Sequence, residues 1–205
     1  MNARMMQRRE FIGMGLALGA AGLAGCAGPQ YAGDGWQRLV DGRSVPAGWT
    51  KVGGDGWSVV DGTLQGAGTT PSAAAYLVSP QSYTDFELRA EFWADHACNS
   101  GIFIRCRDRN KIGADSAYEV NVFDQRPDPK YGTGAIVNIA AVSPMPKAGN
   151  RWNIFDVVAR GDNLVVFLNG QQTVNVRDSK HKSGPIALQN GGGVIRWRSV
   201  DLRVL

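Results

Sequence analysis

Apolar and polar residues alternate through most of the chain after residue 35, and this pattern predicts β-strands. Between Tyr83 and Asp124 it predicts three successive strands, over residues 85–93, 101–107 and 118–124. Successive side chains of a strand point to opposite faces of its sheet, so the apolar residues of each strand share one face. If the three strands neighbour one another, the other face carries a mixed polar and aromatic set: Arg89, Glu91, Trp93, Phe103, Arg105, Glu119 and Asn121.

That mixed face has two interpretations. Aromatic rings cover the C–H patches of a sugar and charged groups bind its hydroxyls, so the face suits a saccharide. Charged outer faces are also ordinary in antiparallel sheets. In that case Glu119 simply forms a cross-strand salt bridge with Arg105 or Arg89. The alternation alone favours the second interpretation.

The rest of the chain predicts further short strands separated by turns. Asp61-Gly62 joins two strands within residues 57–65, and Asn169-Gly170 joins two more within 163–176. The remaining predicted strands cover residues 75–79, 135–141, 152–159, 186–189 and 194–204. The fold class is therefore all-β, a sandwich or jelly roll whose last strand pairs with the start of the domain.

The first 25 residues predict export. Arg8 and Arg9 precede an apolar run, Phe11 to Leu23, that is too short to cross a membrane as a helix. The arginine pair resembles a twin-arginine export signal. The sequence LAGC, which ends at Cys26, resembles a bacterial lipobox, implying cleavage before Cys26 and a lipid on its thiol. The alternative is a short anchor helix with an incidental cysteine.

This interpretation divides the chain into three parts: a cleaved signal peptide over 1–25, the lipidated Cys26 with a short linker over 26–35, and a domain over 36–205. The mature protein would lie in the periplasm, held to a membrane by its lipid. Ala27, which follows the cysteine, fits sorting to an outer membrane.

Charge and length narrow the function classes. The 205 residues suffice for one domain with a full core. The net charge is +4, of which Arg4, Arg8, Arg9 and Glu10 contribute +2, so the remainder carries only +2. No basic run or aromatic–basic motif is present, and a nucleic-acid partner is not predicted.

Two cysteines remain after Cys26. Export permits a disulfide, but Cys106 lies in the apolar phase of its strand, so two buried thiols are predicted and the pairing of Cys98 stays open. A catalytic cysteine needs a neighbouring base, and only His96 is close in sequence. His96 and His181 are predicted at the surface, and no HExxH motif or Cys/His cluster indicates zinc. An oxygen-rich site for calcium or another divalent ion stays open.

Nine phrases, taken in order, carry a resemblance to one family. They are LVDGRSVPAGW, GWSVVDGTLQG, YTDFELRAEFW, NSGIFIR, YEVNVFD, TGAI, RWNIFDVVARGDNLVVFLNG, GPIALQNGG and VIRWRSVDLRVL. Across residues 36–205 they resemble the 3-keto-disaccharide hydrolase family, also known as domain of unknown function 1080. The resemblance implies a concanavalin A-like jelly-roll sandwich of the lectin/glucanase type. It also implies cleavage of glycosidic bonds in sugars oxidised to a ketone at C3, with a partner sugar dehydrogenase supplying them.

The resemblance also implies site residues. Asn99, Ser100 and Arg105 stand in the family's NSGIFxR phrase, Glu119 and Asp124 in its YEVQxxD phrase, and Gln189 in its LQxHG phrase. Asn121 replaces the family's glutamine, and Gly191 replaces its histidine, removing a potential metal ligand or proton carrier. Asn99 and Ser100 are alternatively turn formers, and Asp124 a turn cap.

Two chemical routes fit these residues. A C3 ketone acidifies the C2 proton, so a base can form an enolate that expels the C1 substituent, and water can then add. In this hypothesis Glu119 is the base, Arg105 stabilises the enolate, and Asp124 or Glu91 is the acid or a metal ligand. The competing route is direct hydrolysis by the carboxylate pair Glu91 and Glu119. The expected substrate-binding residues are Asn99, Ser100, Arg89, Trp93, Asn121 and Gln189.

The sequence therefore leaves more than one function class. The first is an exported, lipid-anchored enzyme that cleaves 3-keto-glycosides or disaccharides as a hydrolase, by elimination and hydration or directly. The second is a carbohydrate-binding module on the same sandwich without catalytic machinery. The third is a structural envelope lipoprotein.

Overall fold

The computed structural model describes residues 35–205, which form two antiparallel β-sheets. The larger sheet has eight strands in the order β11-β10-β9-β6-β13-β4-β3, with β1 also paired to β13. Their bounds are β1 (Trp36–Val40), β3 (Trp57–Val60), β4 (Thr63–Gly66), β6 (Phe86–Ala94), β9 (Arg151–Arg160), β10 (Asn163–Leu168), β11 (Gln171–Arg177) and β13 (Ile195–Val204).

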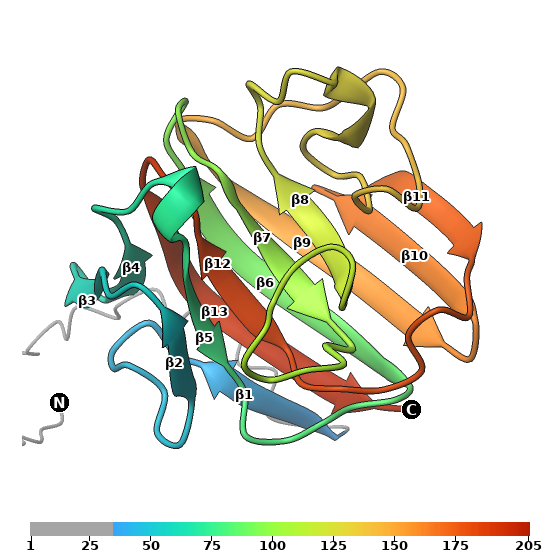
Figure 1. Cartoon of the computed structure of the whole chain (residues 1–205), viewed down its shortest axis with the longest axis horizontal. Coiled ribbons are helices and arrows are strands. Elements are labelled where there is room, and N and C mark those ends of the chain that lie inside the picture. Colours follow the sequence, from blue (N-terminus) through green and yellow to red (C-terminus); the bar gives the residue numbers. More distant parts are fainter. Residues whose placement is uncertain (1–34) are drawn as a thin grey trace, which may run out of the picture. The chain divides into compact units, whose positions relative to one another are not determined.

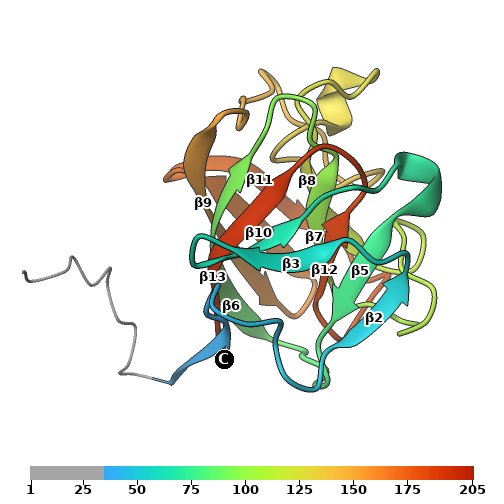
Figure 2. The same cartoon turned by 90° about the vertical axis from the view of Figure 1, so that its left-hand side faces the viewer.

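The smaller sheet has five strands in the order β2-β5-β12-β7-β8. They are β2 (Thr50–Gly53), β5 (Ala75–Val78), β7 (Ser100–Ile104), β8 (Tyr118–Val122) and β12 (Ala187–Asn190). Two 3₁₀ turns, η1 (Pro71–Ala73) and η2 (Pro129–Tyr131), lie in the connections. The sheets stack face to face, with β7, β8 and β12 in front of β6, β9 and β13 in Figure 1. Figure 2 shows β9 and β13 on the left and β2 and β5 on the right.

The main core lies between the inner faces of the two sheets. In β6 every second residue is buried, as the alternation requires. Phe92 stacks on Phe155 of β9 with ring centroids 5.0 Å apart, and it contacts Trp197 of β13 at 5.6 Å. Burial of such rings supplies much of the stabilisation, because each removes a large apolar area from water.

The smaller sheet is also buried on its outer face. Every residue of β7 and β8 is buried. A second apolar cluster covers this outer face: Val78, Phe103, Cys106, Ala117 and Ala187, with Val52, Tyr76 and Ile112 packed against it. Side chains therefore cover the outer face of the smaller sheet, whereas the outer face of the larger sheet is solvated.

The hairpin and pairing predictions are confirmed. Asp61 and Gly62 have φ angles of 49° and 69°, the left-handed values that a two-residue hairpin needs at both central positions. They join β3 to β4, and Asn169-Gly170 joins β10 to β11. β1 pairs antiparallel with β13, so the start and end of the domain lie together.

Two predictions about strands are wrong. Of the three strands considered as neighbours, β7 and β8 pair in the smaller sheet, but β6 belongs to the larger one, so the three do not share a face. Alternation fixes which residues share a face of one strand but not which strands pair. Residues 135–141 form turns with isolated bridges at Ile136 and Ala140 rather than a strand, and their backbone groups bond mainly within the turn.

The predicted signal peptide, Cys26 and nearly all of the linker lie outside the described residues. Within residues 35–205, no helix is long and apolar enough to span a membrane. Cys98 and Cys106 are both free and buried, as predicted. Burial raises the pKa of the Cys106 thiol to about 12 and raises that of Cys98 as well, so neither is a nucleophile near neutral pH.

Candidate functional site

Four strands of the smaller sheet place polar side chains together on its outer face. Tyr76 of β5 is the register partner of Gln189 of β12. Ala187 and Leu188 of β12 pair with Phe103 and Ile102 of β7, and continuing this register places Gln189 beside Gly101. On β8, Asn121 pairs with Gly101 and Glu119 pairs with Phe103. The candidate site is thus a row of Tyr76, Gln189, Gly101 and Asn121, flanked by Glu119.

Glu119 is the buried carboxyl of this face. It is 8% exposed, and its carboxylate has no hydrogen bond or ion pair within residues 35–205. Burial raises its pKa to about 7, against the opposing influence of the Arg126 cation. Near neutral pH the group therefore exists in both protonation states, as a general acid–base catalyst requires.

Gly101 sets the direction of the Glu119 side chain. A Cβ at Gly101 would lie 3.4 Å from Cγ of Glu119 and 2.9 Å from the Val120 carbonyl oxygen, so the position has room only for glycine. Glu119 accordingly leans across Gly101, which lies between β8 and β12.

Tyr76 faces Glu119 from the other end of the row. Its hydroxyl lies 3.4 Å from Nε2 of Gln189, and its ring contacts Phe103 edge to face at 5.5 Å. Burial raises the pKa of Tyr76, and the negative charge of Glu119 adds to this shift, so the two groups affect each other electrostatically. Tyr76 and Arg126 were missed by the sequence analysis, although alternation in residues 75–79 places Tyr76 opposite the core residue Leu77.

Asn99 and Gly191 border the row beside Gln189. Gly191 donates its N–H to the Asn99 carbonyl at 2.9 Å. A Cβ at Gly191 would lie 3.3 Å from Nδ2 of Asn99 and 3.3 Å from Nε2 of Gln189. The backbone oxygen of Asn99 lies nearer still, at 3.0 Å, so both side-chain amides lie close to the Gly191 backbone and a larger residue would crowd them. The Asn99 amide has no hydrogen-bond partner among the described residues.

Ser100 and Asn121 are mainly structural. Ser100 is fully buried and donates to the backbone oxygen of Gln189 at 2.7 Å, so it ties β7 to β12 rather than facing a ligand. Asn121 donates from Nδ2 to the Tyr131 carbonyl at 2.7 Å, while its Oδ1 is buried without a partner in the described region.

Asp124 fastens the long loop that follows β8. Its carboxylate accepts hydrogen bonds from Oγ1 of Thr133 at 2.6 Å, the N–H of Ala148 at 3.0 Å and the N–H of Gly149 at 2.9 Å. These bonds join the two ends of the segment between β8 and β9, part of which lies at the top of Figure 1. Because the carboxylate is buried and saturated with donors, it resembles the predicted turn cap more than an acid catalyst.

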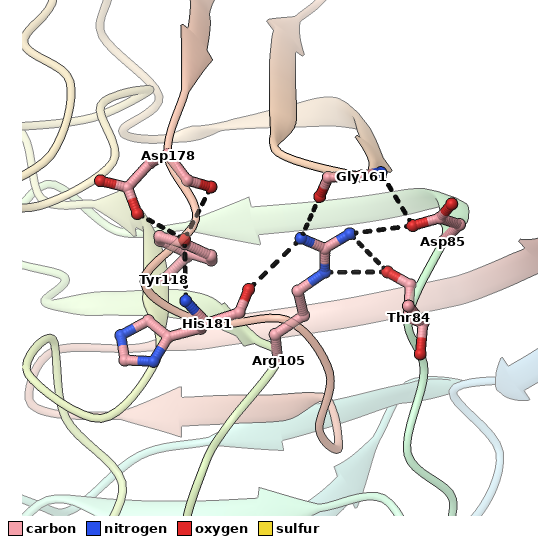
Figure 3. A network of polar contacts seen from close by, with 7 residues as sticks. All are labelled: Thr84, Asp85, Arg105, Tyr118, Gly161, Asp178 and His181. Carbon is pink, nitrogen blue, oxygen red and sulfur yellow. Dashed lines mark hydrogen bonds and ion pairs between the residues drawn. The ribbon is translucent and has the colours of Figure 1, made fainter.

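Arg105 does not lie on the face of Glu119, and this prediction is wrong. Arg105 has a φ of 54°, which ends β7 at Ile104 and breaks the alternation. Its guanidinium is buried and donates to three carbonyls: Thr84 at 2.5 and 2.8 Å, Gly161 at 2.7 Å and His181 at 3.3 Å. It also pairs with Asp85 at 3.2 Å (Figure 3). The residue joins loops from both sheets.

His181 continues this cluster and is buried, contrary to the surface position predicted for it. Its backbone N–H donates to the Tyr118 hydroxyl at 3.0 Å, and that hydroxyl donates to Oδ1 of Asp178 at 2.5 Å (Figure 3). The imidazole contacts the Tyr118 ring edge to face at 4.8 Å, and neither ring nitrogen has a partner in the described region. Burial lowers the pKa of His181, so the ring is neutral at pH 7.

Arg89, Glu91 and Trp93 lie on the outer face of the larger sheet, away from Glu119. Arg89 pairs with Asp156 at 3.1 Å. Glu91 pairs with Arg198, and the Arg196 guanidinium lies over the Trp93 ring at 5.4 Å. Because the core separates the two outer faces, Glu91 and Glu119 cannot form the carboxylate pair of a direct glycosidase. The predicted common site for these residues is wrong.

No metal cluster appears on the described part of the chain. Residues 35–205 contain no group of three or more His, Cys, Asp or Glu side chains placed to hold a metal ion. On the outer face that carries Glu119, Oε1 of Gln189 and Oδ1 of Asn121 are buried and have no hydrogen-bond partner among residues 35–205. A divalent ion therefore stays an expectation from the sequence.

The fold and this face together define a lectin-like β-sandwich with polar side chains on the outer face of its smaller sheet. A family model for the 3-keto-alpha-glucoside-1,2-lyase-like domain matches residues 35–203. The chain belongs to this family, and the resemblance seen in its sequence is confirmed. No curated protein in the comparison matches the chain.

Three solved structures illustrate the fold. A candidate glycosyl hydrolase from Parabacteroides distasonis ATCC 8503 superposes with a TM-score of 0.70 at 17% identity, covering 83% of this chain and 94% of its own. The carbohydrate-binding module CBM66 from Bacillus subtilis gives 0.57 at 17% identity, covering 82% and 95%. The exoplasmic/lumenal domain of VIP36, bound to Ca²⁺ and Man3GlcNAc, gives 0.61 at 11% identity, covering 84% and 91%. These likenesses confirm the concanavalin A-like sandwich.

Proposed function

We propose that the domain cleaves the glycosidic bond of 3-keto-glycosides by elimination across C1 and C2, with Glu119 as the base. The observation that carries the proposal is the Glu119 carboxyl. It is buried, lacks a partner among the described residues, and has a pKa raised to about 7. An uncompensated buried carboxyl is costly for a fold, and such groups are concentrated at active sites. Membership of the 3-keto-alpha-glucoside-1,2-lyase-like family supports this choice of substrate class.

The chemistry needs one group that accepts a proton and returns it. The Glu119 carboxylate takes the C2 proton, and the C–H electron pair forms a C2=C3 enolate. When the enolate reverts to a ketone, this pair forms a C1=C2 double bond and the C1–O bond breaks. The leaving oxygen keeps the bonding pair and takes the proton from the Glu119 carboxylic acid. Addition of water to the unsaturated ketone then gives the same products as hydrolysis.

Space for a second sugar residue lies beside this face. A cavity of about 430 Å³ is lined by the β7–β8 loop, including Arg107, Lys111 and Ser116, and by Asn138. Ile112 also lines it and packs against the outer-face cluster that contains Phe103. A disaccharide bound at Glu119 could thus extend into a cavity whose lining combines charged and apolar residues, which suits both the hydroxyl groups and the C–H faces of a sugar.

A carbohydrate-binding module is the second candidate function. The observation that favours it is Gly191, which stands where the family phrase has a histidine. The domain also shares its fold with CBM66, which is a carbohydrate-binding module. In this case the outer face would bind a saccharide without cleaving it.

Product analysis distinguishes the two functions. The full chain is incubated with 3-keto-trehalose, with added Ca²⁺ in one arm and a chelator in another, and the products are followed by mass spectrometry. We expect release of glucose and of an unsaturated ketosugar lighter than 3-keto-glucose by one water. Calorimetric binding of the substrate without release would identify a binding module. Release only in the Ca²⁺ arm would establish the divalent ion.

The location of the enzyme is part of the proposal and is supported by the sequence alone. The twin-arginine pair and the lipobox favour an exported lipoprotein held at the membrane through Cys26. An exported enzyme would meet 3-keto-glycosides made outside the cytoplasm by a sugar dehydrogenase. The full chain should partition into the detergent phase in a cloud-point separation, and a Cys26→Ser variant should stay in the aqueous phase.

A further inference from the structure

Elimination through an enolate needs an electrophile at the C3 oxygen, and the structure leaves this role unassigned. Arg105, the residue expected from the sequence, is held in a structural cluster by the carbonyls of Thr84, Gly161 and His181. No cation bonds to the side chains of the Tyr76–Asn121 row within residues 35–205. Arg126, in the loop after β8, acts on Glu119 electrostatically, but no hydrogen bond or ion pair joins it to Glu119 within residues 35–205.

We infer that the side-chain amides of Gln189 and Asn99, together with the Tyr76 hydroxyl, bind the C3 oxygen of the substrate and stabilise the enolate. This inference rests on the proposed function. In this inference, three neutral hydrogen-bond donors take the role that the sequence analysis gave to the charged Arg105. Preorganised neutral donors stabilise a developing oxyanion effectively when water is excluded from the site.

The first support is convergence. The nitrogen atoms Nδ2 of Asn99 and Nε2 of Gln189 each lie 3.3 Å from the position of a Cβ at Gly191. The same position lies 3.0 Å from the backbone oxygen of Asn99, so a side chain at residue 191 would crowd both amide groups, and glycine lets them lie close to its backbone. The Tyr76 hydroxyl lies 3.4 Å from the same Nε2. The three groups thus lie near one another, and in our inference one substrate oxygen beside Gly191 accepts hydrogen bonds from β5, from β12 and from Asn99, which precedes β7.

The second support is the protonation state of Tyr76. Burial raises its pKa, and the nearby negative charge of Glu119 raises it further. The hydroxyl thus keeps its proton while Glu119 is ionised, so it remains a donor when the base is active. The site can therefore hold an ionised Glu119 and a protonated, neutral Tyr76 at the same time.

The third support is the span between base and donors. Glu119 leans across Gly101 from β8, and Gln189 lies on β12 beyond β7. Neighbouring strands are about 4.8 Å apart, so two spacings give roughly 10 Å between these strands. A pyranose ring fits this distance with its C2 proton towards Glu119 and its C3 oxygen towards Gln189 and Asn99.

Exchange of the C2 proton in D₂O tests the inference directly, because it reports enolate formation without bond cleavage. We would follow it by NMR on a 3-keto-glucoside for the full chain and for Gln189→Met, Asn99→Asp and Tyr76→Phe. We expect exchange and kcat to fall about 10²-fold or more in the first two variants, with KM changed less than kcat. Tyr76→Phe keeps the ring on Phe103 and should lose about tenfold, since one of three donors is removed.

The controls separate a structural effect from an electrophilic one. Asn175→Ala removes an exposed amide on β11 and should exchange like the wild type. Asn99→Asp changes the charge at nearly constant volume, so a folded but inactive variant supports the inference. Its pH profile should still report a base with a pKa of about 7 in any residual activity.

Two outcomes would overturn the inference in different ways. If the wild type exchanges but the amide variants stay within twofold of it, the donors are elsewhere and only this inference is wrong. Loss of exchange in Arg126→Met alone would assign the role to that cation. A wild type that neither exchanges nor cleaves contradicts the proposed function itself.

Discussion

Glu119→Gln should lower kcat/KM for a 3-keto-glycoside by about 10²- to 10⁴-fold, the usual contribution of a general base. The amide has the shape of the carboxyl but cannot accept the C2 proton. Substrate binding should persist, because the donors on Tyr76, Gln189 and Asn99 are unchanged. Initial rates of glucose release and calorimetric titration of the variant measure the two quantities separately.

The pH profile provides an independent check on the same residue. The pKa of Glu119 is raised from 4.5 to about 7, so kcat/KM of the wild type should rise as pH passes through about 7 and then level off. A raised carboxyl pKa also means that ionisation destabilises the folded state above the unfolded pKa. Glu119→Gln should thus be more stable than the wild type at pH 8, by on the order of 3 kcal/mol at 1.36 kcal/mol per pKa unit.

Glu91→Gln is the matched control. Glu91 is paired with Arg198 on the outer face of the larger sheet, so its loss should leave turnover unchanged. If both single variants, Glu91→Gln and Glu119→Gln, lose activity, the two carboxylates act together. That result would favour direct hydrolysis of the glycosidic bond by a carboxylate pair. Full turnover by Glu119→Gln would remove Glu119 from the mechanism.

Strand positions were predictable here because alternation is a local property of the chain. The period-two pattern located β6, β7 and β8, and the Asp61-Gly62 turn was readable from its residue types. The sheet to which each strand belongs was not predictable, because it depends on long-range packing between residues that are distant in sequence. This explains why Arg89 and Glu91 were assigned to the face of Glu119 although β6 crosses to the other sheet.

The site was predictable only in part for a similar reason. Glu119 and Gln189 came from short phrases of a family pattern, and the structure places them on one face. Tyr76 belongs to no such phrase and becomes visible only when β5 is seen next to β12. Arg105 was misplaced because a single positive φ reverses the direction of a side chain, and a bulky residue rarely adopts that conformation.

Arg105→Met should destabilise the domain by about 3–5 kcal/mol, the typical cost of removing one partner from a buried ionic cluster. The guanidinium is 1% exposed and donates to the carbonyls of Thr84, Gly161 and His181, besides pairing with Asp85. Without it, the carbonyls that face the guanidinium lose their donor in a buried region. Urea denaturation followed by tryptophan fluorescence measures the loss.

The expected result separates a structural role for Arg105 from a catalytic one. Arg105→Lys should recover only part of the stability, because an ammonium group cannot reproduce the planar fork that reaches three carbonyls. Arg203→Met, which breaks a half-exposed pair with Glu87 at 2.5 Å, should cost no more than about 1 kcal/mol. At a temperature where Arg105→Met is folded, its kcat should be close to that of the wild type. If Arg105→Met instead keeps wild-type stability but has no turnover, Arg105 is catalytic. The enolate would then be stabilised by its guanidinium rather than by the amides of Gln189 and Asn99.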